Sequence, residues 1–561
     1  MLPHLPAPAL TELGRTGGGP GTLALLVRDQ DTRRLLMLRA LLEAAEAAPA
    51  STCPAVARER LAQDWALLEA AEAAEAAETL STRATATAGR PRAAGVGERA
   101  ESTDLGEPAE AADGGGPYEG TDDGGRYEAA DDAGRSASAD DPAPRKPHGT
   151  RLPRLTGEHR IPAARAALLH PLLGPWAQRC LRGLGPAHAP ADAAERERHR
   201  RELAADLAHF SAVAAAVAAR SGVPYEVRLT PHAGQLVLPS LGALHTDAPH
   251  LDLVHRAGRL TFRAPGAADV VVRVQDTVGA WSASRHWTSA YALPGLLADD
   301  APLPLDDLDP YRTVHGGPHY YGLSGPVTLD DGERKRWLQA WSGTADALRL
   351  GGEQRLAETR ALLRCLVPLA VPPGASAGGR STGGCSATRR EAFGAVLSST
   401  PPSATGFAAT LVHELHHAKL TVLTEMVTLH HSDGQARYFA PWRPDPRPYD
   451  GLLQGAYSHL ALADYFQRRA LTGTDPVHRE DAWAQYARYH EQVGAALPAL
   501  VGSDQLTEVG RQFVDALVGH HQRLAEQPAP RAHAFRAREY VRAARRLWAQ
   551  RHGLDVRHPR D

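Results

Sequence analysis

The sequence has few cysteines. Only Cys53, Cys180, Cys365 and Cys385 occur in 561 residues, and no two of them form a C-x-x-C pair. A zinc ribbon or an iron–sulfur cluster needs closely spaced thiolates, so this spacing excludes both kinds of site. Isolated cysteines are typical of reduced thiols inside the cell. We therefore expect a cytoplasmic protein.

The sequence also lacks a long apolar run and a strong charge of either sign. No stretch of 18 apolar residues occurs, and the N-terminus lacks the charged-then-apolar pattern of a signal peptide. The formal net charge is -3 at pH 7, so no basic surface for nucleic acid is indicated. We expect a soluble protein that binds neither nucleic acid nor a membrane.

Composition divides the chain into five segments. Residues 1–83 have apolar side chains at helical spacing, whereas 84–155 contain almost no large apolar residue and are predicted to be a disordered insertion. We expect helices over 156–222, a β-rich region over 223–330 and a helical metal-binding domain over 331–561. The predicted fold class is α+β and predominantly α-helical, with a small central antiparallel β region.

Local patterns predict individual elements. Alternating apolar and polar residues around position 233 predict a β-hairpin that joins strands at 225–229 and 236–238. A helix is predicted at 353–369, and the apolar run 392–397 is predicted to be a strand beside the motif helix described next. The last part of the chain is predicted to form four helices, at 451–471, 480–497, 504–526 and 531–551.

Residues 411–417, with the sequence LVHELHH, contain an H-E-x-x-H motif. Apolar residues over 407–423 recur at helical spacing, so the motif is predicted to lie on an amphipathic helix. His413 and His417 are one helical turn apart, and two imidazoles so placed can share one metal ion. Glu414 lies beside that face, where a general base for a metal-bound water would be.

A third protein ligand has to come from elsewhere in the chain. The metzincin extension needs Gly at position 420 and His at position 423, but the sequence has Leu420 and Leu423 there. His430 and His431 would lie about 20 Å from His417 along a continued helix, which is too far to reach the same ion. We interpret them as residues at the C-terminal end of the motif helix.

His459 is the preferred third ligand. It lies within the largely apolar stretch 451–461, which can return antiparallel to the motif helix after the loop 433–450. A lone histidine on an apolar helix is more often a packed core residue, but two histidines with unmet coordination favour ligation here. Asp464 and Glu425 are alternatives, because a carboxylate would complete a zinc site or a 2-His-1-carboxylate iron site.

The loop before this second helix contains the sequence PWRPDPRP at 441–448. Its four prolines stiffen the backbone, and Arg443 and Arg447 stand near the predicted metal site. They are either solvated charges on a rigid loop or a guanidinium fork for the carboxylate of a substrate or cosubstrate. The residue pattern alone leaves both interpretations open.

Together these motifs resemble a bacterial family, the H-E-x-x-H domain proteins encoded near, or fused to, radical SAM maturases in actinobacterial peptide-modification clusters. The similarity covers most of the chain outside the insertion. It is carried by the N-terminal leucine-rich helices and by the stretches LHP at 169–171, VLPSL at 237–241, SATRREAFG at 386–394, LVHELHH at 411–417, PWRPDPRP at 441–448 and GLLQGAYSH at 451–459.

The resemblance implies α-ketoglutarate-dependent β-hydroxylation of a ribosomally made precursor peptide, with Fe(II) bound at the H-E-x-x-H motif. Carried over by motif, His413, His417 and His459 would be the iron ligands. From the chemistry of the loop, Arg447 in the first place and Arg443 in the second would receive the α-ketoglutarate carboxylate. The chain contains no radical SAM domain, so any such maturase would be a separate protein.

Two other functional classes stay open. The same residues could form a zinc peptidase, in which Zn²⁺ replaces iron and Glu414 deprotonates the metal-bound water. A non-enzymatic alternative is a precursor-binding partner of a maturase, which would bind the peptide tightly without needing a metal.

Overall fold

The computed structural model describes residues 5–88, 163–185, 192–313, 325–371 and 384–552. Contacts divide the chain between Met1–Leu80 with Ile161–Asp561, which form one compact unit, and Ser81–Arg160, of which only residues 81–88 are described. The predicted disordered insertion lies outside the described residues, apart from its beginning at 84–88, which is helical.

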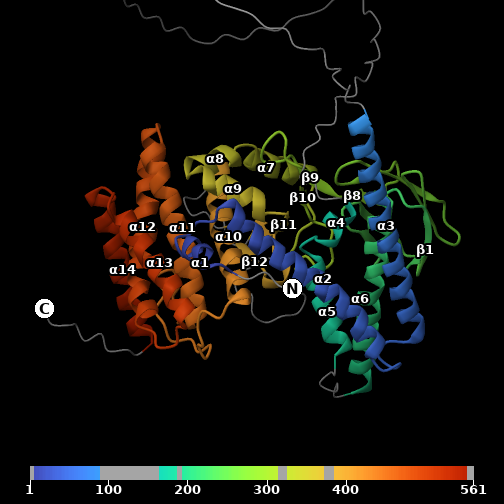
Figure 1. Ribbon diagram of the computed structural model, residues 1–561, viewed down its shortest axis with the longest axis horizontal. Helices are drawn as coiled ribbons and strands as arrows, with labels where there is room; N and C mark the ends of the chain where they lie inside the picture. Colours follow the sequence, from blue (N-terminus) through green and yellow to red (C-terminus); the bar gives the residue numbers. More distant parts are fainter. Residues whose placement is uncertain (1–4, 89–162, 186–191, 314–324, 372–383, 553–561) are drawn as a thin grey trace, which may run out of the picture. The chain divides into compact units, whose positions relative to one another are not determined.

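The predicted fold class is confirmed. The chain is mostly helical, with 57% helix, antiparallel and mixed sheets in the middle and a helical C-terminal region (Figure 1). The helices before the first strand are α1 (Ala7–Gly14), α2 (Pro20–Ala47), α3 (Ala55–Ala88), α4 (Ala163–Leu168), α5 (Leu173–Leu184) and α6 (Ala193–Arg220). By length and composition α6 could cross a membrane, but 72% of its most apolar window is buried inside the fold, which is typical of a core helix.

Two antiparallel sheets follow. The first has the order β1 (Tyr225–Leu229), β4 (Leu251–Arg256), β5 (Arg259–Arg263), β6 (Val270–Val274) and β7 (Ala280–Trp281). The second has the order β2 (Gln235–Leu238), β3 (Gly242–His245) and β8 (Trp287–Ser289). The predicted hairpin between β1 and β2 is wrong, because β1 pairs with β4 and β2 pairs with β3 in the other sheet. Between β1 and β2, His232 and Gln235 form an isolated antiparallel bridge.

The third sheet is mixed and lies beside the motif helix. Its order is β12 (Ser386–Thr388), β13 (Ala395–Ser399), β11 (Cys365–Leu369), β10 (Leu303–Leu305) and β9 (Tyr291–Leu293). The pairs β10–β11 and β11–β13 are parallel, with Cys365 opposite Ala395. The predicted helix 353–369 is therefore wrong in its second half. All five residues of β11 are buried between two parallel neighbours, so their uninterrupted apolar run belongs to a central strand.

The remaining helices are α7 (Asp331–Ser342), α8 (Thr344–Leu350), α9 (Glu353–Leu362), α10 (Ala404–Met426), α11 (Tyr449–Thr472), α12 (Pro476–Val501), α13 (Glu508–Ala525) and α14 (Arg531–Arg551). The motif helix is α10. The Ser403 hydroxyl accepts a hydrogen bond from the Gly406 N–H at 3.1 Å and caps its start. Because α10 ends at Met426, His430 and His431 do not belong to its last turn, and that interpretation was wrong.

The core around α10 is apolar and continuous. Side chains of α10 and α11 are buried together with residues from α1, α2, α7, α8, α9, α12 and α13. Packing against these elements therefore holds the motif helix from several sides.

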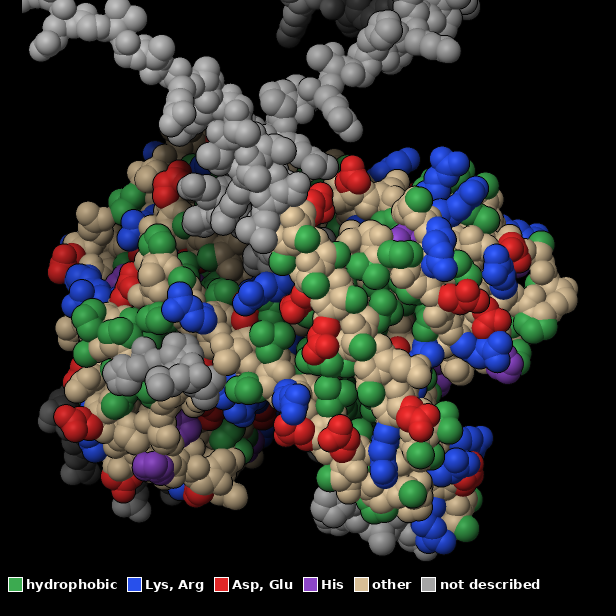
Figure 2. Space-filling model, turned by 45° about the vertical axis from the view of Figure 1, so that its right-hand side comes forward, with side chains coloured by type: hydrophobic (Ala, Val, Ile, Leu, Met, Phe, Trp, Pro, Cys, Tyr) green, Lys and Arg blue, Asp and Glu red, His purple; other side chains and the backbone are tan. Residues whose placement is uncertain are grey.

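On the face of the molecule that Figure 2 shows, Lys and Arg side chains lie among Asp and Glu side chains.

Gly174 marks a close approach between α5 and the turn before β13. A Cβ atom at this position would lie 1.9 Å from the carbonyl oxygen of Glu391. That oxygen belongs to the backbone, so it cannot move away as the end of a flexible side chain could. We expect Gly174→Ala to lower the free energy of unfolding by about 1–3 kcal/mol or more, as overpacking does. Gly21→Ala is the matched control, because Gly21 lies in α2 with open space around it. Urea denaturation of both variants measures the difference, and equal midpoints would contradict this packing.

Candidate metal centre

The two motif histidines face each other on α10. Their Nε2 atoms are 3.1 Å apart, and their ring centres are 4.6 Å apart with the rings nearly perpendicular. This geometry follows from the spacing of four residues, which places both side chains on one face of the helix. The structure therefore brings His413 and His417 together as predicted.

Helix α11 runs antiparallel to α10, as predicted. The ring of His413 lies near that of His459, whereas His417 and Thr421, further along α10, both contact Gln454, which is earlier in α11. The Gln454 amide oxygen lies 3.2 Å from His417 Nδ1. An acceptor at Nδ1 fixes the ring and the tautomer and leaves the Nε2 lone pair available for a metal.

His459 is held between two aromatic rings. The ring centre of Trp442 lies 4.5 Å from that of His459, and the stacked ring of Tyr489 lies at 5.2 Å. Trp442 reaches this position because residue 455 of α11 is a glycine. A Cβ atom on Gly455 would lie 2.4 Å from the indole. The loop 441–448 thus contributes directly to the surroundings of the predicted third ligand.

The three predicted ligands lie close together without forming a complete metal site. The ring centres of His413 and His459 are 5.5 Å apart. Two imidazoles on one ion, with metal–nitrogen bonds of about 2.1 Å, have ring centres roughly 5 Å apart, so the separation fits. Within the described part of the chain, however, no group of three His, Cys, Asp or Glu side chains converges closely enough to hold an ion. The described geometry is thus a histidine pair with His459 adjacent.

Burial keeps the imidazoles of His413 and His459 neutral. Burial, followed by the charges of His417 and His459, lowers the pKa of His413 well below its usual value. Burial, followed by the charges of His417 and Arg488, lowers the pKa of His459 to about 3. The Nδ1 atoms of His413 and His459 are buried and have no hydrogen-bond partner. Neutral imidazole is the form that binds metals, so the protonation state of His413 and His459 fits a metal ion.

Glu414 points to a different environment. Its carboxylate accepts a hydrogen bond from the Ser386 hydroxyl of β12 at 2.7 Å, and the side chain is 3% exposed. Burial raises the pKa of Glu414, although His417 and hydrogen bonds from Ser386 and Thr388 oppose that effect. The glutamate of the motif therefore joins α10 to the mixed sheet.

A third face of α10 carries what we call the buried charge cluster. The Arg355 guanidinium donates to Glu358 at 2.9 Å and to Asp464 at 2.7 Å, and it lies 3.0 Å from His416 Nε2. The Lys419 ammonium donates to Glu358 at 2.9 Å. The members of the cluster are Arg355, Glu358, His416, Lys419 and Asp464, and all are buried.

The two alternative carboxylate ligands are engaged elsewhere. Asp464 belongs to the buried charge cluster and also accepts from Arg468 at 3.0 Å. The carboxylate of Glu425 accepts from Gln30 at 2.8 Å and from Arg390 at 2.6 Å. Neither carboxylate joins the histidine pair, which leaves His459 as the candidate third ligand.

The two loop arginines share one carboxylate partner. Arg443 Nε lies 3.1 Å and Arg447 Nη1 lies 3.6 Å from the Asp445 carboxylate. Arg447 also packs over Gly451 at the start of α11, where its Nε is buried without a hydrogen-bond partner. Arg447 thus keeps a free donor near α11, whereas the Arg443 side chain is 44% exposed.

Several contacts of this site carried no signal in the sequence. Gln454 and Ser386 contact the motif from other elements, and nothing in their local patterns indicates it. Arg488, on α12, was also not predicted. Its guanidinium lies over the rings of Tyr489 and Tyr540, and its charge contributes to the low pKa of His459. Trp442, Gln454 and Ser386 all lie within stretches that carry the family resemblance, whereas Arg488 lies outside them.

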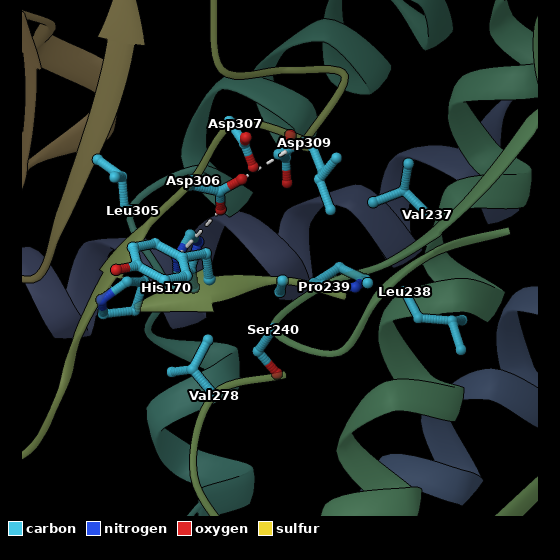
Figure 3. Close-up of a pocket in the computed structure, with 15 residues that line it drawn as sticks. His170, Val237, Leu238, Pro239, Ser240, Val278, Leu305, Asp306, Asp307 and Asp309 are labelled. Atoms are coloured by element: carbon cyan, nitrogen blue, oxygen red, sulfur yellow. Dashed lines mark hydrogen bonds and ion pairs between the residues drawn. The ribbon is translucent and has the colours of Figure 1, made fainter. Parts of the chain in front are cut away.

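A small cavity lies away from the histidine pair, among acidic residues of the β region (Figure 3). Asp306 lies 3.6 Å from His170, and the Asp309 N–H donates to Asp306 at 3.1 Å. Burial, followed by the charge of Asp306, raises the pKa of Asp309 to about 8. The cavity has a volume of about 20 Å³. That is enough for roughly one water molecule, so it does not accommodate a substrate.

Comparison with known proteins does not assign a family. No family model matches the chain, and no curated protein matches it.

Gln454 offers a test of the metal site. Gln454→Leu keeps the size of the side chain but removes the acceptor at His417 Nδ1. Loss of such a partner typically costs about 10–100-fold in metal affinity, and we expect that decrease for Zn²⁺ in calorimetric titration. Gln339→Leu, at an exposed position of α7, is the control. Unchanged affinity in the Gln454 variant would show that this contact does not orient a ligand.

Proposed function

We propose that the protein is an Fe(II)- and α-ketoglutarate-dependent hydroxylase that acts on a ribosomally synthesised peptide, with His413, His417 and His459 as iron ligands. The observation that carries the proposal is the pair of motif imidazoles with Nε2 atoms 3.1 Å apart and a third imidazole beside it. Three histidine ligands would leave coordination positions open for a keto acid and O₂, as the three protein ligands of the 2-His-1-carboxylate oxygenases do.

When bound, iron and the keto acid supply the oxidising chemistry: one atom of O₂ enters a C–H bond of the peptide, and the other enters succinate as CO₂ leaves. The residues of the chain bind and orient these groups. Gln454 fixes the ring of His417, and Trp442 and Tyr489 shield His459 from water. Arg447 is the first candidate for the carboxylate of the keto acid and Arg443 the second.

The position of Glu414 favours this reaction over the zinc peptidase alternative. A peptidase needs the glutamate as a general base within hydrogen-bond reach of a metal-bound water. Here its carboxylate is buried and bonded to Ser386 on the mixed sheet. A hydroxylase does not need that base, so a structural glutamate is compatible with it. A separate radical SAM maturase as partner stays a prediction.

Reconstitution tests the proposal directly. Under anaerobic conditions, Fe(II) followed by α-ketoglutarate should produce a visible charge-transfer band, and O₂ should then release succinate. His459→Ala should abolish both signals, because iron would lose a ligand. His431→Ala, an exposed histidine outside the site, should retain them. Absence of the band and of succinate release with every candidate peptide would contradict the hydroxylase.

Glu414→Gln separates the two reaction classes. The glutamine oxygen can still accept the Ser386 hydroxyl, so fold and metal binding should persist. We expect peptide oxygenation, measured as the added mass of one oxygen atom, to fall by less than about tenfold, whereas loss of a general base typically costs 10²–10⁴-fold. Ser386→Ala is the control for the hydrogen bond itself. A peptide cleavage activity that disappears in Glu414→Gln would establish the peptidase instead.

A further inference from the structure

A larger cavity lies beside the buried charge cluster. It has a volume of about 330 Å³, within the range of about 300–1,000 Å³ that is typical of small-molecule pockets. The loop between α1 and α2, the start of α9 and parts of α11 and α13 form its wall. The charged or titratable side chains that line it are those of Glu12, Arg15, Arg355, Asp464, Arg468 and His520.

The wall of this cavity carries excess positive charge. Three arginines and two carboxylates line the cavity, and both carboxylates already accept hydrogen bonds. Glu358, which also pairs with Arg355, shares its charge with Lys419. Glu12 accepts hydrogen bonds from the Gly19 N–H and the Thr22 hydroxyl at the start of α2. Asp464 accepts from Arg355 and Arg468. Arg15 forms no ion pair with any residue that the structure describes, so a positive charge remains at the cavity without an acidic partner.

Two buried N–H donors in the wall also lack acceptors. Arg355 is 1% exposed, and its Nε has no hydrogen-bond partner. His520 is 9% exposed, and its Nδ1 lies 3.1 Å from a nitrogen of Arg523, which can only donate. The proton of neutral His520 is therefore on Nε2, which is buried, forms no hydrogen bond and lies 3.9 Å from the Asp464 carboxylate. Unsatisfied buried donors are costly, so the wall favours a ligand that supplies acceptors.

We propose that this cavity binds a small organic carboxylate. Arg15 and Arg468 supply the positive charge, and Arg355 and His520 supply N–H donors from the buried side of the wall. A carboxylate provides the negative charge and the acceptor oxygens that this wall lacks. The site is separate from the histidine pair, and the proposal does not depend on the reaction catalysed there. It adds a second ligand site next to the charge cluster that holds the motif helix.

Calorimetric titration of the full-length, metal-free protein with succinate tests the site. EDTA and the double variant His413→Ala/His417→Ala exclude binding through a metal. We expect succinate to bind with a dissociation constant below about 10 mM and succinamide, which has the same shape without charge, not to bind. Binding of succinate and succinamide alike, or of neither, would overturn the proposal.

Two variants locate the ligand. Arg15→Ala removes an exposed side chain without an ion pair, so the fold should persist, and we expect about tenfold weaker binding of succinate from loss of a charge-assisted bond. His520→Phe should also weaken binding while keeping the ring in place. Arg28→Ala, at an exposed arginine on α2 outside the cavity, is the control and should bind as the unmodified protein does. Inorganic phosphate that binds where succinate does not would assign a different oxoanion site and contradict the proposal.

Discussion

Arg355 connects four parts of the chain through one guanidinium. It donates to the backbone carbonyl of Thr16 in the N-terminal loop, to Glu358 in its own helix and to Asp464 in α11, and it lies beside His416 in α10. Removing one partner of a buried ion pair typically costs about 3–5 kcal/mol, because the other charge stays buried without compensation. These contacts fix how the N-terminal loop, α9, α10 and α11 pack against one another, so Arg355 contributes to the relative position of α10 and α11.

Residues 413–417 of the motif helix face three different environments. His413 and His417 face α11 and the candidate metal position, Glu414 faces β12, and His416 faces the buried charge cluster. Successive side chains on a helix are about 100° apart, so the side chains of five consecutive residues point to all sides of the helix. The same geometry gives the histidine pair its rigidity, because the other faces of the helix are bonded to a sheet and to a charge network.

The sequence was most informative where a local period decides the outcome. The spacing of His413 and His417 predicts their contact, and the apolar pattern predicts α10 and the antiparallel α11. It failed where partners come from far along the chain. The alternation at β1 is real, but its partner is β4 and not the adjacent β2. The apolar run of β11 resembles the end of a helix until its two parallel neighbours are known. The contacts of Gln454 and Ser386 with the motif are also long-range, and no local pattern encodes them.

The contacts of Thr16 have a consequence for how the chain reaches this structure. Its carbonyl oxygen accepts from Arg355 and from Lys419, which are 339 and 403 residues further along. During synthesis the N-terminal loop leaves the ribosome long before α9, α10 and α11 exist, and it has no charged partners until they appear. Contacts of such sequence separation are slow to form, because the entropy of closing a very long loop is lost before they stabilise anything. The histidine pair can form within α10 alone, whereas its fixed surroundings are among the last parts of the protein to be completed.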